Sequence, residues 1–229
     1  MKFLSYDSPF SQLLLKLCYS CYLNLLWLIC CIPIVTIGAS TTALYYTSLK
    51  IVRGEDHALG HMFFRSFREN FRQSTVLWLI LLATGLFLAG DGYLAYRLRA
   101  ASTGAPAVLW TLILALVIGA AVVYTIVLLF VFPLVASVSN TNWAMLKNSF
   151  LIGTHYLFCT ILVFAVHAVM LFVIISIFTP MFILGEGLCA LVSAFLMNNV
   201  LRACSYDPNA PAEAEDDAAD VDGEDGGDA

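Results

Sequence analysis

The sequence predicts an all-α protein, a polytopic transmembrane helix bundle of about five spans with short cytoplasmic interfacial helices. Of its 229 residues, 61% are hydrophobic and only 12% are charged, about half the charged fraction of an average soluble domain. A bilayer core needs roughly 20 apolar residues in a helix. Three uncharged stretches of about that length or longer are present, from Arg72 to Asp91, from Arg99 to Lys147 and from Lys147 to Glu186. This pattern excludes a soluble globular fold, a disordered chain and a disulfide-dense secreted module.

The order of the elements follows from where charged residues and prolines interrupt the apolar stretches. Each span is expected to be helical, because lipid offers no partner for an unpaired strand edge. The first span is the least regular, since Lys16 lies at its start, Asn24 lies inside it and Pro33 breaks its end. Spans are expected near residues 17–36, 74–96, 107–132, 155–179 and 182–202. Interfacial helices are expected near residues 39–53, 60–73 and 140–152.

The charges divide the chain into an integral membrane domain, residues 1–206, and an acidic tail, residues 207–229. The tail holds ten of the 16 Asp and Glu residues and none of the 11 Lys and Arg residues, so the domain before it is basic. Because the tail has almost nothing to bury, it is expected to be disordered. The tail either stays exposed to solvent without contacting the rest of the chain, or it folds back onto Arg65, Arg68 and Arg72.

The distribution of Lys and Arg predicts the orientation, because cytoplasmic loops carry an excess of basic residues. The segments after the first, third and fifth spans carry seven of the eleven. We therefore expect a multi-pass protein of the cell (inner) membrane with its N-terminus outside and its C-terminus in the cytoplasm. If Pro33–Gly38 instead starts a re-entrant hairpin through residues 39–49, the N-terminus is cytoplasmic and the other spans keep their orientation.

Residues 60–73, with the sequence GHMFFRSFRENFRQ, form the clearest amphipathic element. At about 100° per residue, four phenylalanines cover one arc of a helix and three arginines cover the adjoining arc. A Phe face beside an Arg face is typical of a helix that lies among the headgroups of an anionic leaflet. The alternative is a helix that packs on the cytoplasmic end of the bundle. Its arginines then only contribute to the excess of basic residues that cytoplasmic loops carry. The candidate lipid or partner contacts are Phe63, Phe64, Arg65, Phe67, Arg68, Phe71 and Arg72.

A family resemblance rests on four segments, which are Asn24-x-x-Trp27, CIPIVTIGASTTALYY at residues 31–46, Arg53-Gly54-Glu55 and FFRSFRENFRQ at residues 63–73. They resemble the YesL-like family of uncharacterised bacterial multi-pass membrane proteins. The resemblance covers essentially residues 1–206, and the PIVTIGAS stretch is its most specific part. It implies a link to carbohydrate uptake and supplies no catalytic or binding residues. The acidic tail lies outside the family pattern.

Polar residues inside the spans are informative, because each is costly in lipid and tends to face the bundle interior or water. The candidate intramembrane polar residues are Asn24, His167 and Glu186. His167 is the most deeply placed titratable group, near the middle of the fourth span, whereas Glu186 lies near the outer end of the fifth. Interhelical hydrogen bonds account for such residues in many bundles, and a proton relay or a solute contact is the alternative.

The remaining patterns predict no chemistry of their own. Cys18 and Cys21 have C-x-x-C spacing, but a thiolate is unfavourable in lipid, so passive packing fits them better. His57 and His61 are four residues apart, yet the neighbouring glycines indicate a loop rather than a metal site. Nucleophile, phosphate-loop and H-E-x-x-H motifs are absent from the sequence. We therefore predict no catalytic, metal or cofactor site and no enzyme activity.

These observations lead to two functional hypotheses. The first is a non-enzymatic accessory or scaffold protein, linked to carbohydrate uptake, whose partners are the lipid bilayer and another membrane protein such as a transporter complex. The second is a small solute transporter that uses the intramembrane polar residues. A transporter should gather His167 with another polar group, whereas an accessory subunit should show a dry bundle. Nucleic acid is not an expected partner.

Overall fold

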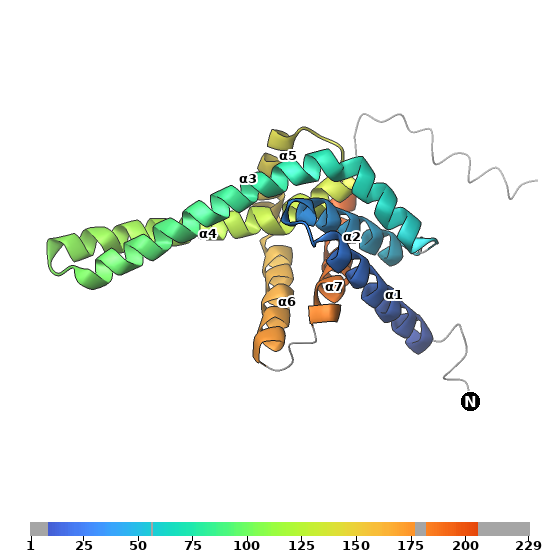
Figure 1. Ribbon diagram of the computed structural model, residues 1–229. Helices are drawn as coiled ribbons and strands as arrows, with labels where there is room; N and C mark the ends of the chain where they lie inside the picture. Colours follow the sequence, from blue (N-terminus) through green and yellow to red (C-terminus); the bar gives the residue numbers. More distant parts are fainter. Residues whose placement is uncertain (1–8, 56, 177–181, 206–229) are drawn as a thin grey trace, which may run out of the picture.

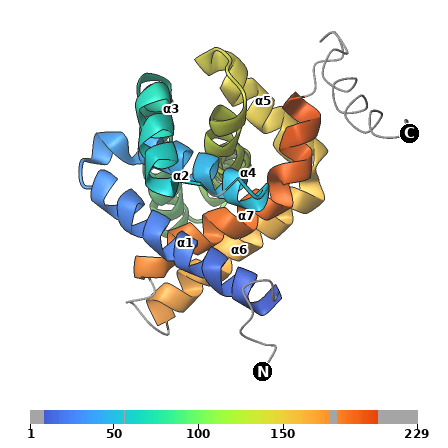
Figure 2. The ribbon, with the colours of Figure 1, turned by 90° about the vertical axis from the view of Figure 1, so that its right-hand side faces the viewer.

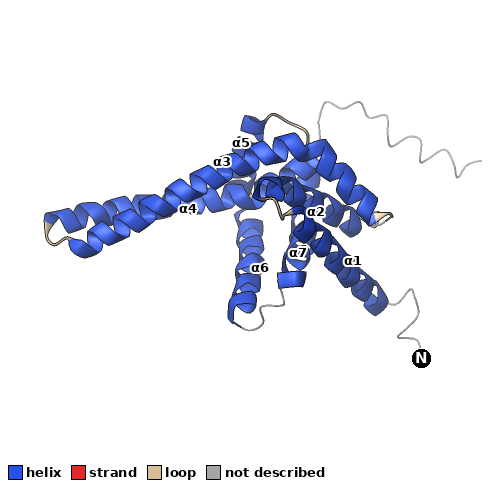
Figure 3. Cartoon of the chain, in the orientation of Figure 1, coloured by secondary structure: helices blue, strands red, loops and turns tan. Residues whose placement is uncertain are grey.

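The structure is a computed structural model, which describes residues 9–55, 57–176 and 182–205. Within these ranges every regular element is a helix (Figure 1; Figure 3). The elements are α1 (Pro9–Cys30), the short 3-10 helix η1 (Ile34–Thr36), α2 (Ile37–Val52), α3 (Leu59–Ala101), α4 (Ala105–Ser137), α5 (Asn142–His155), α6 (Leu157–Ser176) and α7 (Phe182–Ser205). The predicted acidic tail and the last residues of the predicted fourth span lie outside the described residues.

The described chain has two regions, which we call the body and the arm. The arm, residues 82–123, is the antiparallel hairpin made by the second half of α3 and somewhat more than the first half of α4, and it projects away from the rest of the molecule (Figure 1). The body contains the other helices together with the start of α3 and the end of α4. Viewed along the arm, α1, α2, α6 and α7 gather around its base (Figure 2).

Three contacts set the register of α3 against α4. At the base of the arm, the Tyr124 hydroxyl donates a hydrogen bond of 3.1 Å to the carbonyl oxygen of Leu81. Further out, Gly92 lies against the Val117 side chain. Near the tip, Arg99 Nε donates to the Thr111 hydroxyl over 2.9 Å. The two helices therefore stay paired along the whole arm.

The most enclosed helix is α2, in which 12 of 16 residues are buried. The helix predicted near residues 39–53 is therefore present and mostly enclosed by protein, and its interfacial position stays a prediction. Its small and hydroxylated side chains let neighbouring helices approach closely, as small residues do inside membranes. A Cβ atom at Gly38 would meet the backbone of Ser74 and the side chain of Trp78. The Thr42 and Ser74 hydroxyls lie 2.8 Å apart and share a buried hydrogen bond.

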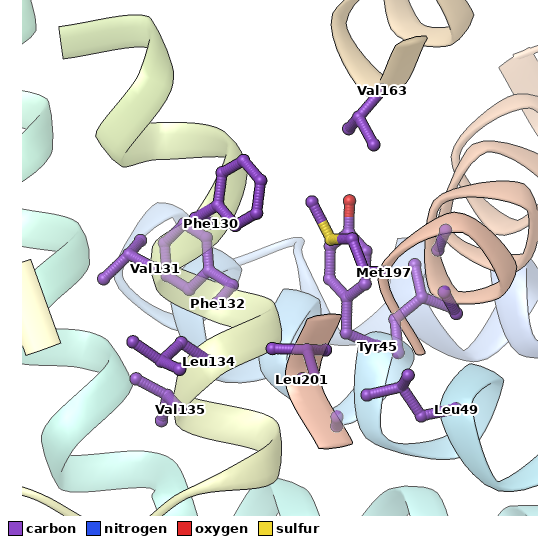
Figure 4. Close-up of a cluster of buried hydrophobic side chains, with 14 of the residues drawn as sticks. Tyr45, Leu49, Phe130, Val131, Phe132, Leu134, Val135, Val163, Met197 and Leu201 are labelled. Carbon is purple, nitrogen blue, oxygen red and sulfur yellow. The ribbon is translucent and has the colours of Figure 1, made fainter. Parts of the chain in front are cut away.

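All seven of the described α-helices contribute to the hydrophobic core of the body, and Figure 4 shows the part of it where α2, α4, α6 and α7 meet. Phe130 and the residues after it enter this core from the end of α4, and Val163 enters it from α6. Met197 and Leu201 on α7 are fully buried in the same cluster. The end of α4 thus belongs to the body, whereas the part before residue 124 forms one side of the arm.

Three of the described helices, α3, α4 and α6, are long and apolar enough to cross a membrane. They indicate a membrane protein and correspond to the predicted second, third and fourth spans. Five spans are not established, because the apolar runs of α1 and α7 are shorter, at Leu14–Cys30 and Gly185–Leu201. The predicted interfacial helix at 60–73 is continuous with the following span, since α3 runs unbroken through both.

Candidate functional site

The candidate functional site lies at the junction of α1, α2, α6 and α7. We call Tyr45, His167, Glu186 and Ser193 the polar centre. Tyr45 is only 4% exposed, and its hydroxyl lies 3.4 Å from Nε2 of His167. The other ring nitrogen of His167, Nδ1, lies 2.8 Å from the carbonyl oxygen of Val163 one turn earlier. Figure 4 shows the Tyr45 hydroxyl directed toward Val163 on α6.

Geometry determines where the hydrogen of a neutral His167 lies. A carbonyl oxygen only accepts hydrogen bonds, so the short contact with Val163 requires a hydrogen on Nδ1. Nε2 is then an acceptor, and the Tyr45 hydroxyl is its donor. The imidazole is thereby held in one tautomer with both nitrogens engaged.

Glu186 brings a carboxyl group to the same place from the start of α7. It is close enough to act electrostatically on His167 and on Tyr45. The next residue, Gly187, donates its backbone N–H to Oδ1 of the buried Asn24 over 2.8 Å. A Cβ atom at Gly187 would meet the backbone of Ser20 and the Asn24 side chain. This close approach of α1 and α7 fixes the position of Glu186.

Buried hydroxyl groups surround the polar centre. Ser20 lies beside Gly187, Ser193 lies beside Tyr45 and Ser40 lies beside Cys31. All three serines are almost completely buried, and their hydroxyls have no hydrogen bond of ordinary geometry within the part of the chain that the structure describes. Buried hydroxyls normally make hydrogen bonds. These three hydroxyls can therefore still donate or accept a hydrogen bond at the junction.

The structure brings two of the three predicted intramembrane polar residues together. His167 and Glu186 share the polar centre, and Asn24 adjoins it through the backbone of Gly187. Sequence reasoning missed Tyr45 and Ser193. Tyr45 lies in α2, which was assigned to the membrane surface, and Ser193 is a lone hydroxyl in an apolar helix. The one available signal was the repeated hydroxylated and small residues of α2, which are typical of a tightly packed helix.

The second candidate surface is on the first turns of α3. Phe64, Phe67, Arg68 and Phe71 line a surface hollow of about 450 Å³. An adjoining hollow of about 310 Å³ is lined in part by Arg65 and Glu69, whose side chains form a hydrogen-bonded ion pair of 2.9 Å. Arg72 is exposed one turn further along. The predicted Phe and Arg surface is therefore present on the outside of the body.

Phe63 does not belong to this surface, which corrects its assignment as a lipid or partner contact. Its side chain is 0% exposed, whereas that of Phe64 is 51% exposed. The two rings meet edge to face at a centroid distance of 5.6 Å. Phe63 lies on the side of α3 that packs on the core, where burial of a large aromatic ring is favourable.

No metal centre is visible in the described ranges, where no three His, Cys, Asp or Glu side chains come close enough together to hold an ion. The polar centre consists instead of one imidazole, one carboxyl group and two hydroxyls. Such a set can bind and pass protons or form hydrogen bonds to a small polar molecule.

Fold and site together define a helical membrane protein with a polar centre inside its body. Residues 21–91 match the model of a protein family described as a protein of unknown function, DUF624. The match covers the second part of α1, α2 and about the first three-quarters of α3, so it includes Tyr45 and the Phe and Arg surface. No curated protein and no solved structure matches the chain. The resemblance to the YesL-like family stays a prediction.

Proposed function

We propose that the protein is a non-enzymatic accessory or scaffold protein of a bacterial cell membrane, and that its arm packs against another membrane protein. The observation that carries this proposal is the projection of the arm from the body (Figure 1). The arm exposes large apolar side chains along its length. The most exposed of them are Leu86, Phe87, Leu112 and Leu116. The body covers the arm only at its base, so the remaining surface is left for lipid or for a partner.

Two glycines support a protein partner on the arm. At Gly90 of α3 and at Gly119 of α4, an added Cβ atom would meet nothing within 4 Å. Small residues on exposed faces let a second helix approach closely, and close packing drives helix association in lipid. The Phe and Arg surface at the start of α3 adds a region suited to anionic headgroups.

The finer predictions of topology and partner form part of this proposal. We propose that α1 and α7 also cross the membrane, giving five spans with the N-terminus outside and the C-terminus in the cytoplasm. The charge distribution of the loops supports this orientation. The resemblance to the YesL-like family supports a carbohydrate-uptake system as the partner.

Purification from cells in a mild detergent, followed by mass spectrometry, tests the proposal. The wild type should carry a membrane protein in stoichiometric amount. Gly119→Leu should reduce this partner at least about tenfold, because the added side chain occupies the space for an approaching helix at a position where an added Cβ atom meets nothing of the protein itself within 4 Å. The control Leu109→Ile, a volume-conserving change on the same helix, should retain the partner. A wild type without any stoichiometric partner contradicts the proposal.

A second candidate function, a small solute transporter, is favoured by the meeting of His167 with Tyr45 and Glu186. Purified protein in sealed vesicles should then take up one member of a panel of radiolabelled sugars. His167→Gln should abolish the uptake, and the exposed His155→Gln should leave it unchanged. Absence of uptake by the wild type counts against transport of these sugars and leaves the accessory role intact.

A further inference from the structure

We propose that the polar centre is a buried proton-binding site, in which His167 takes up one proton at Nε2 and Glu186, Tyr45 and Ser193 stabilise the resulting imidazolium. The inference uses the same residues as the transporter hypothesis, but it does not depend on transport or on a partner. It rests on the hydrogen-bond geometry, on the buried hydroxyl of Ser193 and on the position of the Glu186 carboxyl.

The unprotonated site has only one position for the incoming proton. Nδ1 of His167 already carries a hydrogen, because it donates to the carbonyl oxygen of Val163 over 2.8 Å. The free lone pair is therefore on Nε2, which faces the Tyr45 hydroxyl at 3.4 Å. That distance is long for a hydrogen bond between neutral groups, so the contact has room to shorten when one partner becomes charged.

Protonation at Nε2 reverses the hydrogen bond with Tyr45. The imidazolium donates through both nitrogens, so the Tyr45 oxygen must accept, and its own hydrogen must turn toward another acceptor. Ser193 lies beside the Tyr45 hydroxyl, is fully buried and has no hydrogen bond of ordinary geometry within the described residues. The Tyr45 hydrogen can turn to Ser193 by rotation about the C–O bond alone. No covalent bond breaks, Tyr45 keeps its proton, and the only gain is the proton on Nε2.

Glu186 supplies the opposite charge. An ionised carboxylate beside an unprotonated imidazole leaves one net charge in a poorly solvated region, which is unfavourable. Proton uptake by His167 turns this arrangement into a neutral ion pair, whose attraction is stronger there than in water. Among the described residues, the other titratable groups that interact with the carboxyl are Tyr45 on α2, Cys31 just after α1 and Cys189 on α7. All three are uncharged when protonated, so they offer Glu186 no positive partner.

The residues involved come from three helices. Tyr45 belongs to α2, His167 to α6, and Glu186 and Ser193 to α7. A bound proton therefore strengthens contacts between all three helices at once. Proton binding and the packing of α6 on the body are coupled through these contacts, and each favours the other.

Solution or solid-state NMR of histidine-labelled full-length protein in lipid nanodiscs tests the inference. The His167 signals are assigned by their loss in His167→Gln. In its unprotonated form His167 should carry its hydrogen on Nδ1 alone, and in its protonated form it should carry a second one on Nε2. In Glu186→Gln the proton-binding constant of His167 should fall about tenfold or more, because the opposite charge is lost. Glu69→Gln, the same substitution on the surface of α3, should leave the constant unchanged.

A second variant keeps the test decisive if Glu186→Gln fails to fold. Ser193→Ala removes a single hydroxyl and should weaken proton binding about three- to tenfold, since the reversed Tyr45 hydroxyl then has no acceptor. A hydrogen on Nε2 in the unprotonated form would overturn the inference. So would a proton-binding constant that neither variant changes. Vesicle uptake and partner purification are separate measurements, so this inference can fail or hold independently of the proposed functions.

Discussion

The body and the arm are both built from largely apolar helices, yet they differ in what surrounds those helices. In the body, α2 is enclosed by its neighbours, and small or hydroxylated side chains let these neighbours approach. In the arm, α3 and α4 touch each other along one face and expose large apolar side chains elsewhere. Hydropathy therefore predicts that both regions lie out of water. Small and hydroxylated side chains mark the region that packs against protein, which is the body. Three pairs of substitutions test this difference.

The largest expected effect compares two phenylalanines of α3. Phe63 in the body is fully buried, whereas Phe87 in the arm is 71% exposed. Phe63→Ala should lower the free energy of unfolding by about 3–5 kcal/mol, because it leaves a cavity in the core. Phe87→Ala should lower it by less than about 1 kcal/mol, since no enclosed cavity forms. Detergent-induced unfolding followed by circular dichroism measures both, and equal losses would remove the distinction between body and arm.

An intermediate effect is expected at two glycines. Gly38→Ala introduces a Cβ atom against the backbone of Ser74 and should destabilise the fold by about 1–3 kcal/mol through overpacking. Gly119→Ala in the arm meets open space and should stabilise the helix by up to about 1 kcal/mol. The two substitutions are chemically identical, so opposite signs in the same unfolding measurement would be specific to their surroundings. Destabilisation by Gly119→Ala would mean that another segment of the chain packs against Gly119.

The smallest effect concerns two threonine hydrogen bonds. Thr42→Val in the body leaves the buried Ser74 hydroxyl without its 2.8 Å partner and should cost about 1–2 kcal/mol. Thr111→Val removes an exposed bond from Arg99 in the arm and should cost less than about 0.5 kcal/mol. Adding Ser74→Ala to Thr42→Val should recover part of the loss, because no hydroxyl is then left unpaired. A double variant that is as unstable as the sum of both single ones would show that the hydroxyls do not interact.

Much of the fold could be predicted from the sequence because its strongest signals are local. Uncharged stretches between charged residues located the helices α3, α4 and α6, and Pro33 correctly separated α1 from α2. The environment of α2 could not be predicted in the same way. Its many hydroxylated residues fit a membrane surface as well as a protein interior, and only its contacts with α1, α3, α4 and α7 show that it is enclosed by protein.

The candidate site was predictable only in part. His167 and Glu186 were recognisable because titratable residues are rare in apolar helices. Their meeting with Tyr45, which is 122 residues before His167 in the chain, depends on tertiary packing. Phe63 and Phe64 show the same limit, since both fit an amphipathic face and helix periodicity alone does not decide which of two adjacent residues faces the core.

Photo-cross-linking in nanodiscs tests most directly whether the body leaves the arm uncovered. A benzophenone side chain is placed at Phe87 or Leu116 in the arm, or at the buried Phe130 near the end of α4. In purified protein with labelled phospholipid, the two arm positions should form adducts with lipid, and Phe130 should form adducts within the protein. Adducts of Phe87 and Leu116 with the protein's own chain, in place of lipid, would contradict the account.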